Sequence, residues 1–263
     1  MLSKRIIACL DVRNGQVVKG INFEDLRNAG DPAELASRYN RELIDELVIL
    51  DVTATLESRR ALAETIRAVA HEVFIPLAVG GGIRTEDDAA AAIEAGADKV
   101  SLNTAALAAP TLITSLARRY GSQAVVVAID AKRAHAANRA RAAERAGNYY
   151  AVYVRSGQTA AERDAVEWAR QAEACGAGEI LLTSIDRDGT KSGFDCEMTA
   201  AVSTAVSIPV IASGGAGGFD HFVEVFTQGA ADAALAASIF HYAETSVHAL
   251  KEHLRAHGVP VRL

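Results

Sequence analysis

The sequence predicts a single (β/α)8 TIM barrel, and two observations carry that prediction. Short, β-rich apolar runs alternate with amphipathic helical stretches eight times along the chain, which is the order of elements in an α/β barrel. The chain has 263 residues, close to the usual size of such a barrel as one domain. A doubly wound open sheet is the alternative arrangement of the same elements, but it does not account for the internal repeat described below.

Most of the expected strands are continuous apolar runs rather than alternating ones, as in parallel strands that are covered on both faces. They span residues 5–11, 46–51, 75–79, 99–102, 124–130, 179–184, 208–212 and 233–237. The helices expected between them span residues 32–44, 58–72, 86–95, 110–120, 160–175, 196–206, 219–228 and 245–257.

Capping residues support several of these helices. Asp31 before Pro32 is typical of an N-cap followed by the first helical residue. Thr85 precedes three acidic residues, which predicts a cap followed by a first turn that favours negative charge. Glycines stand where three helices should end, at Gly96, Gly121 and Gly176.

The chain repeats itself at an offset of 133 or 134 positions. The matching segments are residues 75–82 with 208–215, Glu46 with Glu179, and residues 98–104 with 232–238. This offset is too long for a solenoid repeat but fits two half-barrels of four βα units each. We therefore expect one domain over residues 1–263, built from half-barrels at approximately 1–121 and 122–263.

Composition excludes several classes of function. The formal net charge of -6 and the aromatic content of 5% argue against nucleic-acid binding. No apolar run approaches the roughly 18 residues of a membrane span. The three cysteines are odd in number and far apart, which favours neither a disulfide framework nor a zinc site and suits a cytoplasmic protein. A solvated C-terminal helix accounts better than a metal site for His241, His248, His253 and His257.

Two aspartates stand at the ends of matching strands. Asp11 and Asp130 end the first and the fifth expected strands, which face each other across an eight-stranded barrel. Barrel enzymes place their chemistry at this end of the strands. One carboxylate can stay ionised as a base while the other keeps a proton as an acid, because mutual repulsion separates their pKa values. The alternative is that each aspartate only caps the loop or helix that follows it.

Two glycine-rich turns predict two phosphate sites. Residues 80–82 follow the third strand and residues 213–215 follow the seventh. Glycine lets the backbone approach a ligand closely and direct N–H groups at an anion. Further donors end the neighbouring strands, at Asn103, Thr104, Ala237 and Ser238. Each turn could also be an ordinary tight turn, but two copies at a fixed offset favour a substrate with two phosphates that spans the barrel mouth.

Signatures of other ligand sites are missing from the sequence. It contains no G-x-x-x-x-G-K-[ST] and no H-E-x-x-H motif, and the glycines at 80–82 do not continue as G-x-G-x-x-G. We therefore expect no nucleotide cofactor and no catalytic metal. The segment 132–145 is basic and rich in alanine, which fits a surface loop better than an anion site.

Several stretches together resemble one enzyme family over essentially the whole chain. They are residues 5–12, 80–83, 96–100, 128–133, 178–193 and 212–217, and the run over 178–191 is highly specific. The chain resembles the cyclase subunit of imidazole glycerol phosphate synthase, from histidine biosynthesis. The resemblance implies that ammonia is used, without a cofactor, to cleave and cyclise a bis-phosphorylated ribulosyl-formimino aminoimidazole carboxamide ribonucleotide (PRFAR). The implied products are imidazole glycerol phosphate and aminoimidazole carboxamide ribonucleotide (AICAR).

The resemblance also implies roles for individual residues. Asp11 is the expected general base and Asp130 the expected general acid, and Lys19, in the loop after the first strand, is expected to help close over the substrate. The residues implied for one phosphate are Gly82, Asn103 and Thr104. Those implied for the other are Asp188, Gly189, Gly215, Ala237 and Ser238.

A glutaminase partner is implied on the opposite face. Members of the family obtain ammonia from a glutaminase subunit docked on the N-terminal face of the barrel, through a passage gated by a ring of charges. The matching positions, all at strand starts, are Arg5, Glu46, Lys99 and Glu179. Two cations and two anions in a closed ring would compensate one another where a single buried charge is costly. An ordinary polar plug at the barrel bottom is the alternative.

The sequence departs from the family pattern in a few places. Ala78 replaces a threonine, Ala161 and Glu162 replace a Thr-Gly pair, and Leu43 stands where a glycine usually ends the first helix. Residues 131–157 diverge as a whole. Two other functions are therefore weighed against the cyclase: the sister ProFAR isomerase barrel that acts one step earlier, and a non-catalytic barrel that activates a glutaminase partner.

Overall fold

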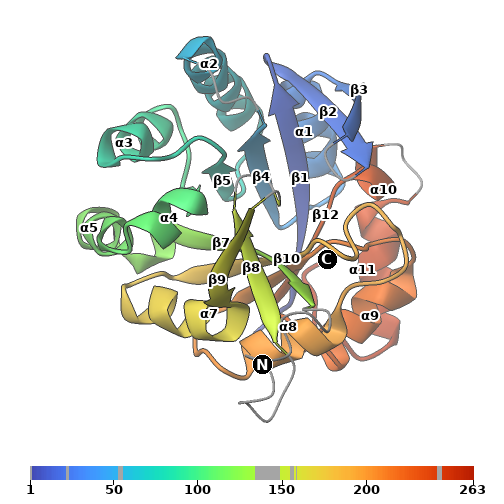
Figure 1. The fold of residues 1–263 in the computed structure, drawn as a ribbon. Helices are drawn as coiled ribbons and strands as arrows, with labels where there is room; N and C mark the ends of the chain where they lie inside the picture. Colours follow the sequence, from blue (N-terminus) through green and yellow to red (C-terminus); the bar gives the residue numbers. More distant parts are fainter. Residues whose placement is uncertain are drawn as a thin grey trace.

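Eight parallel strands close into a barrel, and helices cover its outer side (Figure 1). The computed structural model describes residues 2–21, 24–52, 56–133, 149–154, 157, 159–241 and 245–263. In the order in which they pair, the barrel strands are β1 (Arg5–Arg13), β4 (Glu46–Asp51), β5 (Leu77–Gly80), β6 (Lys99–Leu102), β7 (Val125–Arg133), β10 (Glu179–Ser184), β11 (Val210–Ser213) and β12 (Ala233–Ala236). The pairings of β12 with β1 and of β7 with β10 close the barrel, so the predicted (β/α)8 barrel is confirmed and the open sheet is wrong.

The predicted strand bounds match the structure closely, and the differences have local causes. β4, β6 and β10 match residue for residue. β5 and β11 begin two residues later than expected, because Pro76 and Pro209 precede them and a proline has no N–H to donate to the ladder. β1 and β7 run past their expected ends because an antiparallel hairpin continues from each.

These two hairpins were not predicted. β2 (Gln16–Ile21) and β3 (Glu24–Gly30) follow β1, and β8 (Tyr150–Val154) and β9 (Thr159–Asp164) follow β7. Asn14 and Gly15 form the turn between β1 and β2 with φ values of 52° and 75°, which is the conformation that an Asn-Gly pair adopts in a two-residue hairpin. The expected loop after the first strand is therefore a hairpin, and Lys19 lies in β2, opposite Arg27 of β3.

Helices occupy each of the eight expected connections. They are α1 (Pro32–Arg41), α2 (Leu56–Glu72), α3 (Glu86–Glu94), α5 (Thr111–Tyr120), α7 (Ala165–Ala174), α8 (Cys196–Ser203), α9 (Phe219–Thr227) and α11 (Val247–Ala256). Three short elements were not expected: α4 (Thr104–Ala108), α10 (Ser238–His241) and the 3-10 helix η1 (Ser122–Ala124). In the described part of the chain, no helix is both long and apolar enough to cross a membrane.

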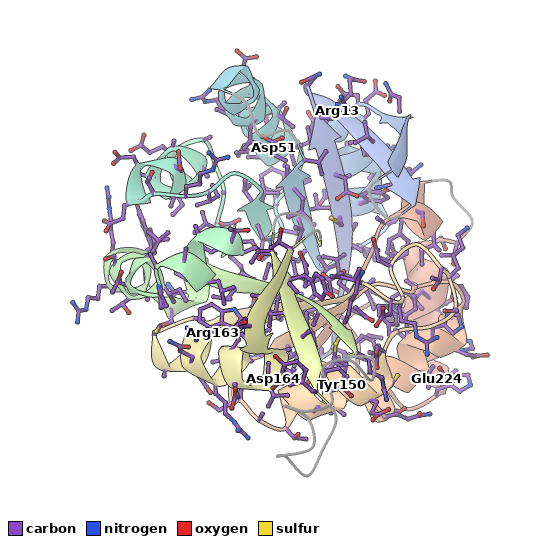
Figure 2. All side chains as sticks on the ribbon, in the orientation of Figure 1. Arg13, Asp51, Tyr150, Arg163, Asp164 and Glu224 are labelled. Carbon is purple, nitrogen blue, oxygen red and sulfur yellow. The ribbon has the colours of Figure 1, made fainter. Side chains whose placement is uncertain are left out.

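The prediction of a helix over 160–175 is wrong at its start, because β9 occupies residues 159–164 and α7 begins at Ala165. The buried Asp164 separates the two elements. Its Oδ1 accepts a hydrogen bond from the Val166 N–H at 3.0 Å, and its Oδ2 accepts one from the Tyr150 N–H at 3.0 Å. Figure 2 labels Asp164 and Tyr150 near the ends of β8 and β9. One carboxylate therefore caps α7 and also fixes the start of β8.

The predicted caps are confirmed. The Asp31 side chain accepts from the N–H groups of Ala33 and Glu34 at the start of α1. Thr85 and Asp88 form a reciprocal capping box at the start of α3. The three glycines expected at helix ends all have positive φ values, at Gly96, Gly121 and Gly176.

The barrel wall separates two apolar clusters. In β1, Ile6, Ala8 and Leu10 face the surrounding helices, whereas Ile7 and Cys9 face the barrel interior. The other buried members of the interior cluster are Val48, Ala78, Val126, Leu181, Ile211, Ala233 and Leu235. Because side chains alternate along a strand, Arg5 and Asp11 lie on the same inward side of β1, at its two ends.

A buried ion pair attaches α11 to the start of the barrel. Lys251 is only 1% exposed, and its Nζ donates to Asp45 Oδ1 at 2.9 Å and to the Leu43 carbonyl at 2.5 Å. Asp45 Oδ2 accepts a hydrogen bond from the Ile6 N–H at 2.8 Å. The pair therefore joins β1, the turn before β4 and α11, although Lys251 lies 206 positions after Asp45.

Leu43 follows α1 with a φ of 64°, and 48% of it is exposed. A left-handed backbone conformation strains a residue with a Cβ atom, whereas glycine adopts it freely. We expect Leu43→Gly to raise the free energy of unfolding by about 1 kcal/mol, because the strain is removed and little apolar contact is lost. Denaturant unfolding measures the change.

Leu43→Ala is the matched control, because it removes the exposed side chain but keeps the Cβ atom. It is expected to give no gain. Equal stability of the glycine and alanine variants would show that the backbone conformation is not strained.

Candidate active site

A cavity of about 870 Å³ opens at the carboxyl end of the barrel strands. Ten of the residues predicted for substrate contact line it: Asp11, Gly82, Asn103, Thr104, Asp130, Asp188, Gly189, Gly215, Ala237 and Ser238. The structure thus brings together one site from residues that are up to 227 positions apart, between Asp11 and Ser238. Its position agrees with the rule that barrel enzymes work at this face.

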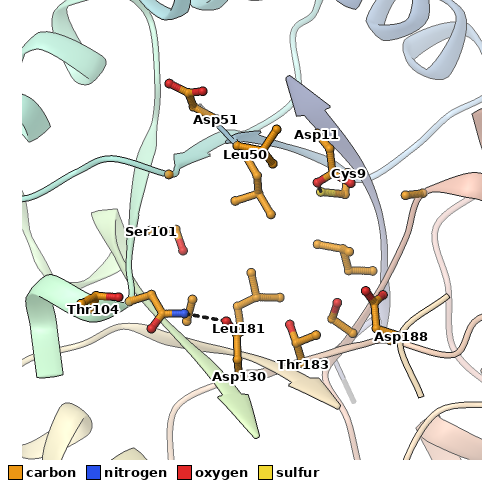
Figure 3. Close-up of a pocket in the computed structure, with 18 of the residues that line it drawn as sticks. Cys9, Asp11, Leu50, Asp51, Ser101, Thr104, Asp130, Leu181, Thr183 and Asp188 are labelled. Carbon is orange, nitrogen blue, oxygen red and sulfur yellow. Dashed lines mark hydrogen bonds between the residues drawn. The ribbon is translucent and has the colours of Figure 1, made fainter. Parts of the chain in front are cut away.

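Asp11 and Asp130 project into the cavity from opposite sides of the barrel (Figure 3). Asp11 is 7% exposed, and the Cys9 Sγ lies 3.6 Å from its Oδ1. Asp130 Oδ2 accepts a hydrogen bond from the Asn103 Nδ2 at 2.9 Å, drawn as the dashed line in Figure 3. Each carboxylate is therefore held by a neighbour and directed at the space between them.

The pKa of Asp130 is raised from 3.8 to about 6, mainly by burial. The nearby Asp188 carboxylate contributes to this rise, while hydrogen bonds from Asn103 and Thr183 oppose it. We expected the repulsion to come from Asp11 across the barrel. Instead the repelling charge belongs to Asp188, which follows the adjacent strand β10. A carboxyl group with this pKa keeps its proton closer to neutral pH than an exposed aspartate does.

Each glycine-rich turn packs against the end of the neighbouring barrel strand that precedes it in the chain: β4 for the turn after β5, and β10 for the turn after β11. Gly81 has a φ of +83°, and a Cβ atom there would lie 2.1 Å from the Asp51 carbonyl oxygen. Gly214, at the matching position, has a φ of +91°, and its Cβ atom would lie 2.6 Å from the Ser184 carbonyl oxygen. Only glycine fits at either position. Gly82 has open space beside it and lines the cavity.

Short helices begin at the predicted side-chain donors of both phosphate sites. Thr104 is the first residue of α4, directly after Asn103, and Ser238 is the first residue of α10, directly after Ala237. The loop after β10 joins the second of these sites, since the Gly193 N–H donates to the Gly215 carbonyl at 2.8 Å and the Asp188 N–H donates to the Ser184 carbonyl at 2.9 Å.

Some cavity residues were missed by sequence reasoning. Cys9, Ser101 and Thr183 line the cavity, as do Asp51 and Lys191. Cys9 and Ser101 lie two positions before Asp11 and Asn103, and Thr183 is paired in register with Asp130. The two-residue period of a strand could have identified Cys9 and Ser101 as inward neighbours, whereas the partner of Asp130 requires the register of a distant strand.

The predicted charged residues at the strand starts form a closed ring of ion pairs at the opposite end of the barrel. Arg5 lies 2.7 Å from Glu46 and 2.8 Å from Glu179, and Lys99 lies 2.9 Å from Glu46 and 2.8 Å from Glu179. The exposed fraction of the four side chains is between 1% and 20%. Burial raises the pKa of Glu46, and the Glu179 charge adds to this shift, while Lys99 and Arg5 oppose it.

The basic alanine-rich segment is described only at its start. The Lys132 Nζ lies 5.0 Å from the centre of the Tyr153 ring, and the Arg133 N–H donates to Asp186 Oδ2 at 3.0 Å. The rest of 132–145 and most of the divergent segment 131–157 lie outside the described residues.

Comparisons with known proteins agree on one family. The family model described as "Histidine biosynthesis protein" matches residues 5–246. The chain is 59% identical over 263 residues to imidazole glycerol phosphate synthase subunit HisF of Acidobacterium capsulatum, and the match covers 100% of this chain and 99% of the relative. The proteins of the same name are 57% identical in Solibacter usitatus, with 100% and 99% covered, and 56% in Chlorobium phaeobacteroides, with 100% of both covered.

Removing the Glu46 charge leaves Arg5 and Lys99 with Glu179 as their one anionic partner in the ring, a net charge of +1. We expect Glu46→Gln to lower the free energy of unfolding by about 3 kcal/mol, because Arg5 and Lys99 then lose a common partner in a site with little water. Denaturant unfolding at neutral pH measures the loss. Glu252→Gln is the control, since Glu252 pairs with His248 at the surface, where an ion pair contributes less than about 1 kcal/mol. Equal losses in the two variants would contradict the compensated ring.

The raised pKa of Asp130 makes its ionised form a cost to folding. Below about pH 4 the carboxyl is protonated in both the folded and the unfolded chain, so it costs nothing; above pH 6 folding must bury its charge. We expect Asp130→Asn to raise the free energy of unfolding by up to about 3 kcal/mol above pH 6, from roughly two pKa units at about 1.4 kcal/mol each. Unfolding curves across this pH range test it, and a gain that does not change with pH would contradict it.

Proposed function

Since the chain belongs to the HisF family of imidazole glycerol phosphate synthase cyclase subunits, we propose that its Asp11 and Asp130 perform the proton transfers that convert PRFAR and ammonia to imidazole glycerol phosphate and AICAR. The observation that carries the proposal is that both carboxylates face one cavity flanked by two glycine-rich turns. The reaction needs a base, an acid and two anion sites, and this cavity supplies residues for each.

Asp11 is the proposed general base and Asp130 the proposed general acid. Ring closure and cleavage require one proton to leave a nitrogen nucleophile and another to reach the leaving nitrogen. Asp130 suits the second task, because burial raises its pKa to about 6 and keeps a proton available near neutral pH. The Asn103 amide orients the carboxyl group by its hydrogen bond at 2.9 Å.

Two sets of donors are proposed to hold the two phosphates at opposite sides of the mouth. Gly82, Asn103 and Thr104 form one set, after β5 and β6. The other set comes from the loop after β10 and from the ends of β11 and β12: Asp188, Gly189, Gly215, Ala237 and Ser238. Asp188 is an anion, so its proposed role is to order the backbone N–H groups of its loop rather than to touch the phosphate. Lys19, in β2, is proposed to close over the bound substrate.

We propose that the ring of Arg5, Glu46, Lys99 and Glu179 gates the entry of ammonia. The four residues close the N-terminal end of the barrel, and the narrow apolar layer of Ile7 and its neighbours lies between them and the two aspartates. A small neutral molecule such as ammonia can cross an apolar layer that excludes ions. The ring would open if one of its four charged residues left its ion-pair partner and paired with a different group.

A glutaminase subunit is proposed to dock around this ring. Among the side chains whose exposure the structure describes, the large apolar ones with high exposure lie on the N-terminal face: Leu2, Leu43, Phe74 and Leu263. Phe74, just before β5, is 95% exposed. Apolar side chains gathered around one face of a barrel indicate a protein interface.

The two half-barrels and the cytoplasmic location are also proposed. The halves are supported by matching details, such as Asp98 and Asp232, which accept hydrogen bonds from the Leu77 and Val210 N–H groups at the starts of β5 and β11. The location is supported by the free thiols of Cys9, Cys175 and Cys196.

The ammonia-dependent reaction of the chain alone tests the catalytic proposal. We expect the unaltered chain to turn over PRFAR with an ammonium salt. We expect Asp11→Asn and Asp130→Asn each to lower kcat by at least about 100-fold, with a smaller change in KM, because each removes a proton-transfer group without removing a phosphate donor. Detection of imidazole glycerol phosphate and AICAR distinguishes this reaction from that of an isomerase.

Glu252→Gln is a suitable control, since Glu252 pairs with His248 at the surface of the outer helix α11. A near-normal rate in either aspartate variant would remove that residue from the mechanism. No turnover by the unaltered chain, together with stimulation of a glutaminase partner, would favour the non-catalytic barrel.

The docking face is tested separately from the chemistry. We expect Phe74→Ser to weaken binding to the glutaminase subunit of the same organism by about tenfold or more. The reaction with added ammonium salt is expected to be unchanged, because Phe74 lies at the opposite end of the barrel from the cavity. Calorimetry measures the affinity. Unchanged affinity would exclude Phe74 from the interface, and Glu252→Gln on the outer helix α11 is the control.

A further inference from the structure

Two histidines and one aspartate come together on the outer surface, away from the cavity. His253 lies in α11 and His257 follows it by four positions, one helical turn later, while Asp220 lies in the first turn of the neighbouring helix α9 (Figure 1). One ligand atom of each residue lies within 4.8 Å of those of the other two. From the sequence alone, a solvated helix accounts better than a metal site for these two histidines, because Asp220, which precedes His253 by 33 positions, reaches them only in the folded chain.

Hydrogen bonds hold both imidazole rings in orientations that suit a metal ion. The His257 Nδ1 lies 2.9 Å from the His253 carbonyl oxygen. A carbonyl oxygen only accepts, so the Nδ1 carries the proton and the Nε2 keeps its lone pair. This is the usual arrangement of a metal-binding histidine, whose second nitrogen donates to a carbonyl or carboxylate. The His253 Nε2 lies 2.9 Å from Asp220 Oδ1. A carboxylate only accepts, so this nitrogen carries the proton, and a metal ion would replace that proton between the two atoms.

Packing restricts the same two rings. Their centres lie 4.2 Å apart, with 33° between the planes, and the Phe219 ring lies 5.3 Å from the His253 ring. The His253 side chain is 26% exposed, whereas the Asp220 side chain is 80% exposed. The histidine is therefore held in place, and the aspartate has room to adjust to an ion.

We propose that Asp220, His253 and His257 bind one divalent transition-metal ion, of which Zn²⁺ is the type, and that the ion joins α9 to α11. Two imidazole nitrogens and one carboxylate oxygen, with water as the fourth ligand, form a donor set that zinc takes in tetrahedral geometry. Zinc ligands lie about 2.0–2.2 Å from the ion, so small side-chain rotations bring the three atoms into range. The ion stabilises the packing of the two helices that cover β11 and β12, outside the reaction chemistry.

Calorimetric titration of the purified chain with Zn²⁺ near neutral pH tests this site. We expect one ion bound per cluster, and His253→Ala and His257→Ala each to weaken its binding by roughly tenfold or more, because each removes one of three protein ligands. Zinc is expected to raise the thermal midpoint of the unaltered chain by a few degrees, since the three ligands come together only in the folded form. The double variant is expected to show no such rise from this site.

His248→Ala is the matched control on the same helix. His248 pairs with Glu252, at 3.5 Å, and does not belong to the cluster, so zinc binding is expected to be unchanged. Zinc bound elsewhere, for example at Cys9 and Asp11 in the cavity, would persist in the double variant and is thereby distinguished. Equal affinities of the unaltered chain and the double variant would overturn the proposal, as would the absence of zinc binding by the unaltered chain. Circular dichroism confirms that each variant is folded, and His257→Gln provides a second, bulkier replacement.

Discussion

The register of the eight barrel strands decides which side chains face the interior, and the rest of the site depends on it. A slip of one residue would turn each inward side chain outward. In β1 the inward positions run from Arg5 through Ile7 and Cys9 to Asp11, and in β10 they run from Glu179 through Leu181 to Thr183. Both strands therefore carry a charge at the N-terminal end of the barrel (its floor), apolar side chains in the middle, and a polar group at the carboxyl end, where the cavity opens (its mouth). The same backbone hydrogen bonds that close the barrel also place these three layers.

Charges at the two ends of the barrel are stabilised in different ways. At the floor, each of the four charged side chains contacts two partners of opposite sign, so the ring compensates itself. At the mouth, Asp130 has an amide and a hydroxyl as partners and another carboxylate nearby, and its pKa rises to about 6. A group held at the expense of folding stability is typical of a site that transfers protons. The charges at the N-terminal end of the barrel therefore stabilise the fold, whereas the ionised Asp130 at the carboxyl end lowers its stability.

The barrel could be predicted from the sequence because its strands are continuous apolar runs and its helices have local caps, such as Asp31 and Thr85. The cavity residues of the repeat, Gly82 and Gly215, were found because they recur at a fixed offset. β9 was missed because its sequence, TAAERD, favours a helix, and pairing with β8 overrides that preference. The hairpin between β1 and β2 does have a local signal, because an Asn-Gly pair such as Asn14-Gly15 favours a two-residue turn. By contrast, the repulsion of Asp130 by Asp188 and the position of Asp220 beside His253 depend on contacts between distant segments.

The ion pair between Asp45 and Lys251 has a consequence for synthesis on the ribosome. The cation that compensates Asp45 emerges 206 residues after it, and β12, which covers the edge of β1 at residues 5–8, also emerges late. Until then the nascent barrel carries an unpaired strand edge, and the Asp45 carboxylate has the Ile6 N–H as a partner but lacks the Lys251 cation. Closure is therefore a late, long-range step, and a chain that stalls before it presents a strand edge on which another copy can pair.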